Sequence, residues 1–407
     1  MIDPRDYGLD NLPFGIVSDE RDGRKHAAVA FEDKVIDLDC LVHDGMLDAD
    51  SLLGATSLND FLGEGLATWR AVRARLRHLL GDAATADERA AVAKRTVPRN
   101  AVTMHLPVDV GDYVDFYSSI EHATNLGRIL RPDGEPLLPN YRHIPIGYHG
   151  RASTIVVSGT PVRRPHGQRK APDASAPVFG PTALLDVEIE MGWIAGKGTA
   201  HGEPVSADAV REHVYGYVLL NDWSARDIQG WEGQPLGPFL AKSFATSISP
   251  WVVSLDALEP FRVAEPARDP EPLPYLHARE PWAYDVELEM LLQTARMRER
   301  AEQPVTVART NFRGMYWTVA QQLAHMTSNG SRIRPGDLFG TGTISGSEQG
   351  TQGSFIELTR RGTAPLTLPN GETRGFLEDG DRVVIRGRAV RGNARIGFGE
   401  VAGTILA

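Results

Sequence analysis

The stretch LLDVEIEM (residues 184–191) alternates carboxylates with apolar side chains, which is the pattern of a β-strand with two different faces. It places Asp186, Glu188 and Glu190 on one face, with neighbouring carboxylates roughly 6.6 Å apart. That spacing lets two carboxylates reach one cation, because hard ions such as Ca²⁺ and Mg²⁺ prefer oxygen ligands. The segment YDVELEM (residues 284–290) alternates in the same way, so the pattern alone fits a solvated sheet face equally well.

Short β-rich runs separated by Gly and Pro turns make up most of the chain beyond residue 107. They predict a C-terminal domain composed mainly of sheet, with one clear helix in MYWTVAQQLAHMTSNG (residues 315–330). The other runs are STIVVSG (153–159), VYGYVLLND (214–222), SISPWVVS (247–254), SFIELTRRG (354–362) and DRVVIRGRA (381–389).

Residues 1–107 differ in character from the rest of the chain. Two short alternating runs, FGIVSD and AAVAFEDKVIDL, indicate a small barrel. Apolar residues at helical spacing then predict a helix over residues 57–80, and a second helix is expected over residues 87–94. We therefore expect an N-terminal barrel domain with helices over residues 1–107 and a catalytic β-rich domain over residues 108–407.

The apolar run VYGYVLLND is typical of a buried strand and ends in Asn221 and Asp222. A buried charge needs a partner, so Asp222 is a candidate ligand or ion-pair residue. Ser224, with an acidic residue three positions later, predicts a helix start that puts Arg226 and Gln229 on one face. Surface salt bridges are the alternative interpretation.

A histidine follows a predicted helix start in DYVDFYSSIEHATN (residues 112–125). Ser118 and Glu121 have the spacing of a capping box, which places His122 in the first helical turn. The helix dipole disfavours imidazolium there, so His122 is a candidate general base near pH 7. An exposed histidine without a role is the alternative. Asp115 and Tyr117 share a face just before this turn if the chain is extended.

Lys242 lies in the apolar run PLGPFLAKSFATSISPWVV (residues 235–253), where a lysine needs an anion or a reacting oxygen nearby. Extension of its side chain to the surface is the alternative. The loop GTGTISGS (residues 340–347) lacks the Gly-Lys-Ser/Thr ending of a phosphate-binding loop, so we do not expect nucleotide binding.

Composition excludes several classes of protein. The net charge of −10 and the absence of long Lys/Arg runs argue against nucleic-acid binding. No stretch approaches the roughly 20 apolar residues that span a bilayer, and the N-terminus has no signal-peptide pattern, so we expect a soluble cytoplasmic protein without membrane contact. Cys40 is the only cysteine, which excludes an internal disulfide and a cysteine-based metal site. An acidic substrate would require local positive charge at its site.

Taken together, these stretches resemble the fumarylacetoacetase family. The resemblance covers most of the chain and includes many long segments in the same order. It rests on DYVDFYSSIEHATN (112–125), LLPNYRHIPIGYHGRASTIVVSGTP (137–161), LLDVEIEM (184–191), NDWSARDIQGWEGQPLGPFLAKSF (221–244), RPGDL (334–338), GTISGS (342–347) and GFGEVAG (397–403). It implies a mainly β, α+β protein with an N-terminal SH3-like barrel, a C-terminal domain of layered, rolled β-sheet, and a homodimeric assembly.

The resemblance also implies an activity and a set of roles. The expected activity is metal-dependent cleavage of the carbon–carbon bond of 4-fumarylacetoacetate to fumarate and acetoacetate, the last step of tyrosine and phenylalanine catabolism. The implied Ca²⁺ or Mg²⁺ ligands are Asp115, Glu188, Glu190 and Asp222, with Lys242 and Thr246 linked to a nearby magnesium. The implied catalytic groups are His122, Glu357, Arg226, Gln229 and Lys242. The implied contacts to the diketo acid are Tyr117, Arg131, Tyr148 and Thr343.

One position departs from the family pattern. Gly233 stands where the family often carries a tyrosine that contacts substrate, which puts substrate affinity and range in doubt. A related diketo-acid hydrolase of the acylpyruvate type and a non-catalytic calcium-binding β-protein are the competing hypotheses. The long N-terminal module argues against the first, and the spread of the candidate ligands over about a hundred residues argues against the second.

Overall fold

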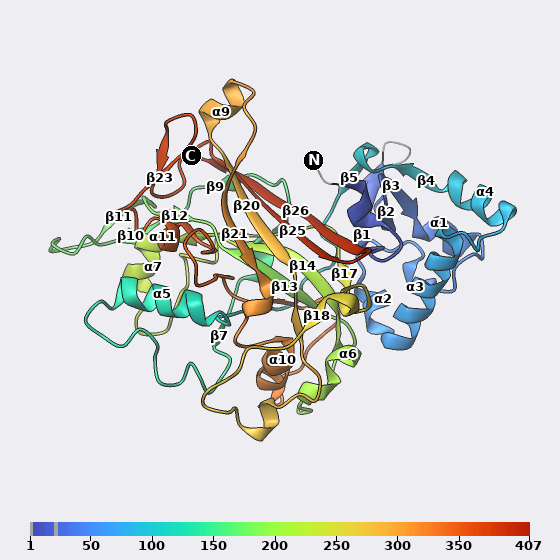
Figure 1. Ribbon diagram of the computed structural model, residues 1–407, viewed down its shortest axis with the longest axis horizontal. Helices are drawn as coiled ribbons and strands as arrows, with labels where there is room; N and C mark the ends of the chain where they lie inside the picture. The colour runs from blue at the N-terminus through green and yellow to red at the C-terminus, as the bar shows by residue number, and fades with distance from the viewer. Residues whose placement is uncertain (1–2, 20–22) are drawn as a thin grey trace.

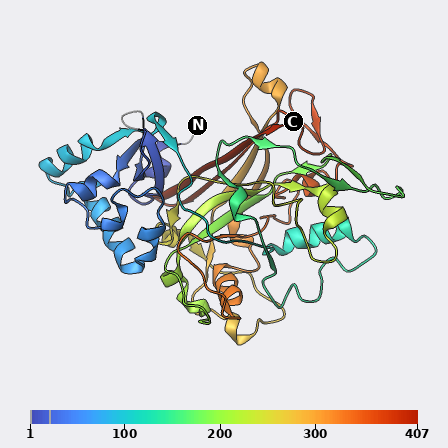
Figure 2. The ribbon, with the colours of Figure 1, turned by 180° about the vertical axis from the view of Figure 1, so that it is seen from behind.

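The computed structural model describes residues 3–19 and 23–407. Its N-terminal part is a five-stranded antiparallel sheet in the order β4-β3-β2-β1-β5, as expected for the SH3-like barrel. This module lies at one end of the molecule, seen from the front and from behind in Figures 1 and 2. Its strands are β1 (Phe14–Asp19), β2 (His26–Phe31), β3 (Lys34–Asp37), β4 (Thr96–Pro98) and β5 (Val102–Met104).

Four helices complete the N-terminal module: α1 (Leu38–His43), α2 (Asn59–Gly63), α3 (Leu66–Leu80) and α4 (Ala86–Lys94). The single helix predicted over residues 57–80 is wrong, because α2 and α3 are separate. Gly65 lies between them with φ +91°, in the left-handed region that breaks a helix. The apolar spacing continues across this break, which is why the pattern alone predicted one helix.

An eight-stranded mixed sheet carries the site described below. Its order is β7-β6-β22-β13-β14-β16-β8, and β17 also pairs with β14. The strands are β6 (Tyr113–Phe116), β7 (Gly147–His149), β8 (Ile155–Val157), β13 (Ile189–Ala195), β14 (Val214–Asp222), β16 (Thr246–Ile248), β17 (Val253–Ser254) and β22 (Leu338–Gly340).

A five-stranded sheet, in the order β21-β20-β25-β26-β9, packs across the first sheet (Figure 1). Its strands are β9 (Val162–Arg163), β20 (Glu287–Gln293), β21 (Val305–Asn311), β25 (Arg382–Arg391) and β26 (Ala394–Leu406). Trp193 and Leu219 from the first sheet share one hydrophobic core with Met290, Ile385 and Phe398 from the second. The mainly β, α+β fold class is confirmed.

Four short two-stranded ladders and seven helices surround the sheets. The ladders are β10–β11 (His166–Arg169, Val178–Pro181), β12–β15 (Leu185–Asp186, Ser224–Ala225), β18–β19 (Arg262–Val263, Ala283–Tyr284) and β23–β24 (Leu366–Thr367, Thr373–Arg374). The helices are α5 (Ile120–Leu130), α6 (Val210–His213), α7 (Arg226–Glu232), α8 (Leu255–Leu258), α9 (Ala295–Glu299), α10 (Val319–Thr327) and α11 (Phe355–Leu358). Within the described ranges, no helix has the length and apolar character needed to cross a membrane.

Strand β14 is buried along its whole length, as its apolar run predicted. Tyr217 and Leu219 point into the core between the two sheets, whereas Val218 and Leu220 pack with the N-terminal module. Both faces of the strand are therefore covered, which explains the absence of an apolar–polar alternation. The hydrophobic cluster that contains Val218 and Leu220 includes residues from both parts of the chain. The division at residue 107 therefore remains a prediction.

Two predicted strands have a different structure. The run SFIELTRRG contains the short helix α11, although its aromatic and β-branched residues favoured a strand. The run LLDVEIEM is interrupted after Asp186, where β12 ends, and resumes as β13 at Ile189. The backbone N–H of Glu188 donates to the side chain of Asn221 at 3.0 Å instead of joining a regular ladder.

Gly216 of β14 provides a test of this packing. A Cβ atom at this position would lie 2.1 Å from the carbonyl oxygen of Val253, which belongs to the backbone of the neighbouring strand. We expect Gly216→Ala to lower the free energy of unfolding by about 1–3 kcal/mol, measured as a lower Tm. Gly314→Ala is the control, because nothing lies within 4 Å of its added Cβ. Equal Tm values for the two variants would contradict this packing.

Candidate active site and metal centre

Four buried carboxylates from three segments of the chain meet at one end of the first sheet. Asp115 lies in β6, Glu190 in β13 and Asp222 at the end of β14, while Glu188 immediately precedes β13. One oxygen from each carboxylate can be chosen so that all four lie within 4.8 Å of one another. This is the ligand group expected from the sequence, and it consists only of the oxygen donors that Ca²⁺ and Mg²⁺ prefer.

A glycine allows two of these carboxylates to approach each other. Strand β22 runs between β6 and β13, and its Gly340 pairs with Asp115 on one side and Gly192 on the other. A Cβ atom on Gly340 would lie 2.6 Å from Asp115 Oδ1 and 3.0 Å from Glu190 Oε2. Any larger residue would therefore fill the space that the two carboxylates occupy.

The electrostatics of this group favour a bound cation. Burial, reinforced by the neighbouring carboxylates, raises the pKa of Asp115 and of Glu190 well above their usual values. Among the described residues, Glu190 Oε1 is buried without a hydrogen-bond partner. A divalent cation would supply both the missing positive charge and a partner for this oxygen, so the residues fit a metal ion.

Lys242 supplies part of the compensating charge. Its Nζ contacts Glu188 Oε2 and lies 2.8 Å from Asp222 Oδ2. Burial opposes ionisation of this lysine, but Asp222 and Glu188 outweigh it and raise its pKa. The two other oxygen contacts of Asp222 come from Tyr148, whose hydroxyl donates to Oδ2 at 2.7 Å, and Thr246, whose hydroxyl donates to Oδ1 at 2.9 Å.

His122 forms a buried pair with Glu357. The distance from Nδ1 of the imidazole to Oε2 of the carboxylate is 2.7 Å, and both side chains are nearly inaccessible. Although burial opposes ionisation of Glu357, His122, Ser354 and Asn125 outweigh it and lower the pKa of this carboxyl group. If Nδ1 donates to Glu357, a neutral imidazole has Nε2 available to accept a proton.

His122 lies in the first turn of α5, but the predicted cap is displaced by one residue. Helix α5 begins at Ile120, and the hydroxyl of Ser119 accepts the N–H of His122 at 3.2 Å. Ser118 instead accepts a hydrogen bond from Gln322 Nε2 at 2.8 Å. Only Ser118 has a glutamate three residues later, so the capping-box pattern favoured it, but its hydroxyl is held by Gln322 and Ser119 caps the helix instead.

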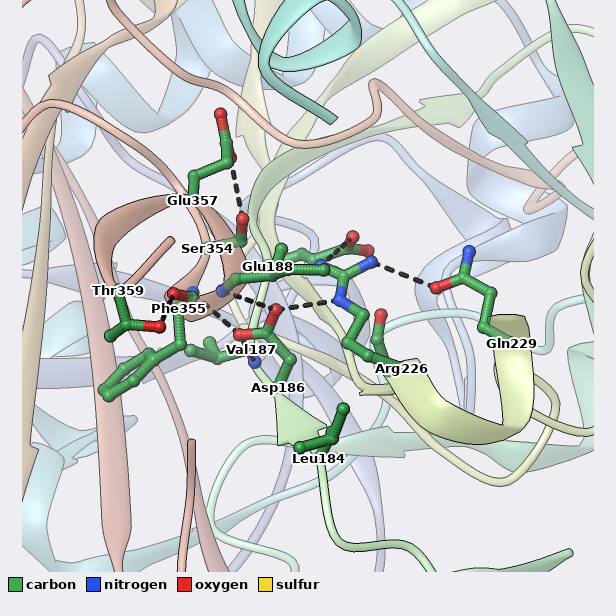
Figure 3. Close-up of polar contacts among 12 residues, drawn as sticks. Leu184, Asp186, Val187, Glu188, Arg226, Gln229, Ser354, Phe355, Glu357 and Thr359 are labelled. Atoms are coloured by element: carbon green, nitrogen blue, oxygen red, sulfur yellow. Dashed lines mark hydrogen bonds and ion pairs between the residues drawn. The ribbon is translucent and has the colours of Figure 1, made fainter. Parts of the chain in front are cut away.

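Arg226 connects the carboxylate group to α7. Its Nη2 donates to Glu188 Oε1 at 2.7 Å, and its Nη1 donates to Gln229 Oε1 at 3.2 Å (Figure 3). The predicted i, i+3 relation of Arg226 and Gln229 is confirmed. The predicted helix start at Ser224 is wrong, because Ser224 belongs to β15, and Ala225 precedes the helix without a side-chain cap.

The four expected substrate contacts are less closely grouped. The ring of Tyr117 packs edge-on against His122, with centroids 5.3 Å apart, and Tyr148 contacts Asp222. Thr343 is buried in the loop after β22. Arg131 is exposed at the end of α5, where it donates to the carbonyl of Pro136. The structure places Tyr117 and Tyr148 directly beside the central groups, and Arg131 at the periphery.

Three polar residues around Glu357 had no role in the sequence interpretation. Ser345 and Ser354 donate their hydroxyls to Oε2 at 2.9 and 2.7 Å, and the amide of Asn125 donates to Oε1 at 3.0 Å. Asn125 follows His122 by one helical turn, so its position on the same face of α5 was a usable signal. Ser354 immediately precedes α11 and lies three residues before Glu357, so it too carried a local signal, the Ser-x-x-Glu spacing of a helix start. Ser345 lies twelve residues before Glu357 and gave none.

Comparison with known sequences identifies the family. A family model described as "Fumarylacetoacetate (FAA) hydrolase C-terminal" matches residues 113–406, and a second, "Fumarylacetoacetase N-terminal", matches residues 10–107. The chain belongs to the fumarylacetoacetate hydrolase family. The family assignment makes it a hydrolase, as the resemblance of its motifs implied.

Relatives within the family align over nearly the whole chain. Fumarylacetoacetase from Mus musculus is 46% identical over 412 residues, covering 100% of this chain and 97% of the relative. Fumarylacetoacetase from Caenorhabditis elegans is 45% identical, covering 98% of this chain and 96% of the relative. The corresponding protein from Arabidopsis thaliana is 43% identical, with coverages of 98% and 96%.

Solved structures show the same family fold at much lower identity. A fumarylacetoacetate hydrolase from Exiguobacterium antarcticum aligns with a TM-score of 0.54 at 17% identity, covering 97% of this chain and 99% of that chain. A maleylpyruvate hydrolase from Sphingobium aligns with a TM-score of 0.51 at 15% identity, with the same two coverages. At these identities the likeness concerns the fold alone.

Metal binding to this family member can be tested through its stability. Because the carboxylates are gathered only in the folded chain, saturating Ca²⁺ or Mg²⁺ should raise its Tm relative to chelator. The gain is about 2.7 kcal/mol when the ion is at a hundred times its Kd. Glu190→Gln should abolish most of this shift. Glu289→Gln is the control, because Glu289 occupies the same alternating pattern but pairs with Arg309 at 2.7 Å.

The metal-dependent rise in Tm should be mostly lost in Glu190→Gln and kept in Glu289→Gln. A metal-dependent rise in Tm that persists in Glu190→Gln but is lost in Glu289→Gln would place the ion elsewhere in the chain. A chain whose Tm responds to neither ion at any concentration would show that the carboxylate group binds neither Ca²⁺ nor Mg²⁺.

Proposed function

We propose that this chain is a cytoplasmic, metal-dependent fumarylacetoacetase that hydrolyses 4-fumarylacetoacetate to fumarate and acetoacetate. The observation that carries the proposal is the buried His122–Glu357 pair beside the carboxylate group. Lys242 and Arg226, with a smaller contribution from His122, lower the pKa of Glu188 against the effect of burial. A general base next to a metal-ligand group is the arrangement that water-mediated cleavage of a β-diketone needs.

In the proposed site, Asp115, Glu188, Glu190 and Asp222 would hold Ca²⁺ or Mg²⁺. The ion would supply Lewis-acid polarisation of a carbonyl group of the diketo acid. Lys242 and Thr246 hold Asp222 from the protein side, as their contacts with its two oxygens indicate. The ion could be Ca²⁺ or Mg²⁺, because both prefer carboxylate oxygens.

His122 would act as the general base. Its Nε2 takes a proton from water, and the water oxygen bonds to the carbonyl carbon that is attacked. Glu357 holds Nδ1 and stabilises the imidazolium that forms, while Asn125, Ser345 and Ser354 hold Glu357 in place. The carbon–carbon bond would then break to leave fumarate, and the enolate carbon would accept the proton held by the His122 imidazolium to give acetoacetate and restore the base.

Arg226, Gln229 and Lys242 would stabilise the two anions of this sequence, the tetrahedral oxyanion and the departing enolate. Arg226 has five N–H groups, and its contacts with the protein use Nε, Nη1 and Nη2 once each. Two N–H groups therefore remain to donate to substrate. Gln229 accepts from Arg226 through Oε1, which leaves its amide nitrogen as a further donor.

Substrate would contact Tyr117, Arg131, Tyr148 and Thr343. Arg131 supplies the local positive charge that an anionic substrate needs on a chain of net charge −10. Burial, reinforced by Glu357 and Glu188, raises the pKa of Tyr117, and Arg226 and Arg131 oppose this only in part. At Gly233, after α7, the family's tyrosine is missing, which would leave this end of the pocket with fewer contacts to substrate.

A homodimer and a division into domains at residue 107 complete the proposal. Large apolar side chains are exposed on β11 and after α7, where Phe179 is 75%, Leu236 98% and Phe239 68% exposed. Exposed apolar groups of this kind are typical of a contact surface. The proposed dimer would cover them.

The assay for the proposed function is loss of the ultraviolet absorbance of 4-fumarylacetoacetate with Ca²⁺ or Mg²⁺ present. Because His122 would remove the proton from water, we expect His122→Gln to lower kcat by about 10²–10⁴-fold. His26→Gln is the control, because His26 is also buried and lies 3.6 Å from a carboxylate, Asp37, but in the N-terminal sheet. That variant should keep the wild-type kcat.

Two results would refute the proposal in different ways. A wild-type chain that leaves the substrate absorbance unchanged would exclude this substrate. A His122→Gln variant as fast as the wild type would retain the substrate but exclude His122 as the base.

A further inference from the structure

Asp186 is a fully buried carboxylate that the chemistry above does not use. It lies at the end of β12, is 0% exposed, and does not belong to the group of four carboxylates that could hold a metal. The alternation of LLDVEIEM predicted that it would share a face with Glu188 and Glu190. The interruption between β12 and β13 instead turns Asp186 toward α7 and α11 (Figure 3).

Both oxygens of Asp186 accept two hydrogen bonds. Oδ1 accepts the backbone N–H groups of Val187 at 2.8 Å and Phe355 at 2.7 Å. Oδ2 accepts Nε of Arg226 at 2.8 Å and the backbone N–H of Ile356 at 3.1 Å. A carboxylate has about four acceptor positions, so these contacts use all of them.

The partners of Asp186 belong to the two halves of the proposed active site. Arg226, on α7, donates to Asp186 through Nε and to Glu188 through Nη2, and two bonds in different directions fix the plane of a guanidinium group. Phe355 and Ile356 form the start of α11, and the next residue is Glu357, the partner of His122. One carboxylate therefore contacts both the anion-stabilising arginine and the turn that orients the base.

These contacts are strong because they are charge-assisted and shielded from water. Neither oxygen of Asp186 is accessible, so the side chain does not meet substrate. Its effect on the reaction must therefore pass through Arg226 and through the backbone of α11. Catalysis is sensitive to displacements of about 1 Å in such groups.

We propose that Asp186 is a positioning residue that holds Arg226 and the Glu357-bearing turn of α11 in a fixed relation to each other. This inference rests on the proposed function, in which Arg226 stabilises the developing anion and Glu357 orients His122.

Asp186→Asn is the direct test, because asparagine has the same shape but only one acceptor oxygen. That oxygen can accept two of the four hydrogen bonds, and the amide nitrogen then faces either Arg226 and Ile356 or Val187 and Phe355. We expect kcat to fall about 10–100-fold, as for other residues that orient a catalytic group, while KM changes much less. Asp186→Glu keeps the charge but displaces it by one methylene, and it should show the same separation of kcat from KM if Asp186→Asn does not fold.

Asp381→Asn is the matched control. Asp381 is also fully buried, and it pairs with Arg374 through bonds of 2.8 and 3.0 Å and accepts the N–H of Glu378 at 2.9 Å. Its loss should lower the Tm in the same way but leave kcat unchanged. A general structural role for Asp186 would make the two variants alike.

A double variant that combines Asp186→Asn with Arg226→Gln shows whether Asp186 acts through Arg226. In that background, Asp186→Asn should lower kcat by much less than it does in the wild type, because the arginine that it positions is already absent. Equal fold losses in the two backgrounds would overturn the inference, as would an Asp186→Asn variant with the wild-type kcat.

Amide hydrogen exchange gives a second measurement that does not depend on substrate. At least one of the N–H groups of Phe355 and Ile356, which donate to different oxygens of Asp186, should exchange faster in Asp186→Asn than in the wild type, whereas Asp381→Asn should leave both protected. Unchanged protection in Asp186→Asn would overturn the inference even if the wild type is an active fumarylacetoacetase. Conversely, inactivity of the wild type with changed protection would refute the proposed function and retain Asp186 as the residue that holds α11.

Discussion

The dominant constraint on this structure is the burial of four carboxylates within 4.8 Å of one another. Isolated buried charges are too costly to keep, so the surrounding residues must compensate for them. Lys242 and Arg226 approach Glu188 from the protein, and the backbone N–H of Gly342 donates to Asp115 and Glu190. These groups satisfy only part of the site, because Glu190 still has a buried oxygen without a partner among the described residues. A cation could therefore complete the compensation of these carboxylates.

The sheet makes this concentration of charge possible. The sheet brings the ends of β6, β13 and β14 to one place, although the four carboxylates are spread over more than a hundred positions of the chain, from Asp115 to Asp222. Gly340 in β22 leaves the space between Asp115 and Glu190, so a residue with no side chain is as important to the site as the ligands. The cost of holding the carboxylates together is offset by the extensive apolar core on both faces of β14.

The sequence predicted element types well where one pattern determined one structure, as in the buried run of β14 and the apolar face of α3. It failed where a distant contact decided between local alternatives. Glu188 and Glu190 had the same alternation as Glu287 and Glu289. Glu287 is nevertheless exposed and pairs with Arg388 at 3.1 Å, because it lies on the face of β20 opposite to Leu288 and Met290, which pack in the core. No local pattern distinguishes these two strands. They differ in burial, because β13 lies between β14 and β22 and is buried along its length.

The prediction for His122 was limited in the same way by a distant contact. The first turn of a helix could be predicted for His122, because capping is a local property of the chain. Its partner, Glu357, lies 235 residues away in a segment whose β-favouring composition indicated a strand. The N–H groups of Phe355 and Ile356, at the start of α11, donate to Asp186. A carboxylate that the sequence pattern grouped with the metal ligands is thus bound to the turn that carries Glu357. Within LLDVEIEM, the interruption between β12 and β13 separates Asp186 from Glu190, and the N–H of Glu188 in this interruption donates to the side chain of Asn221, at the end of a different strand.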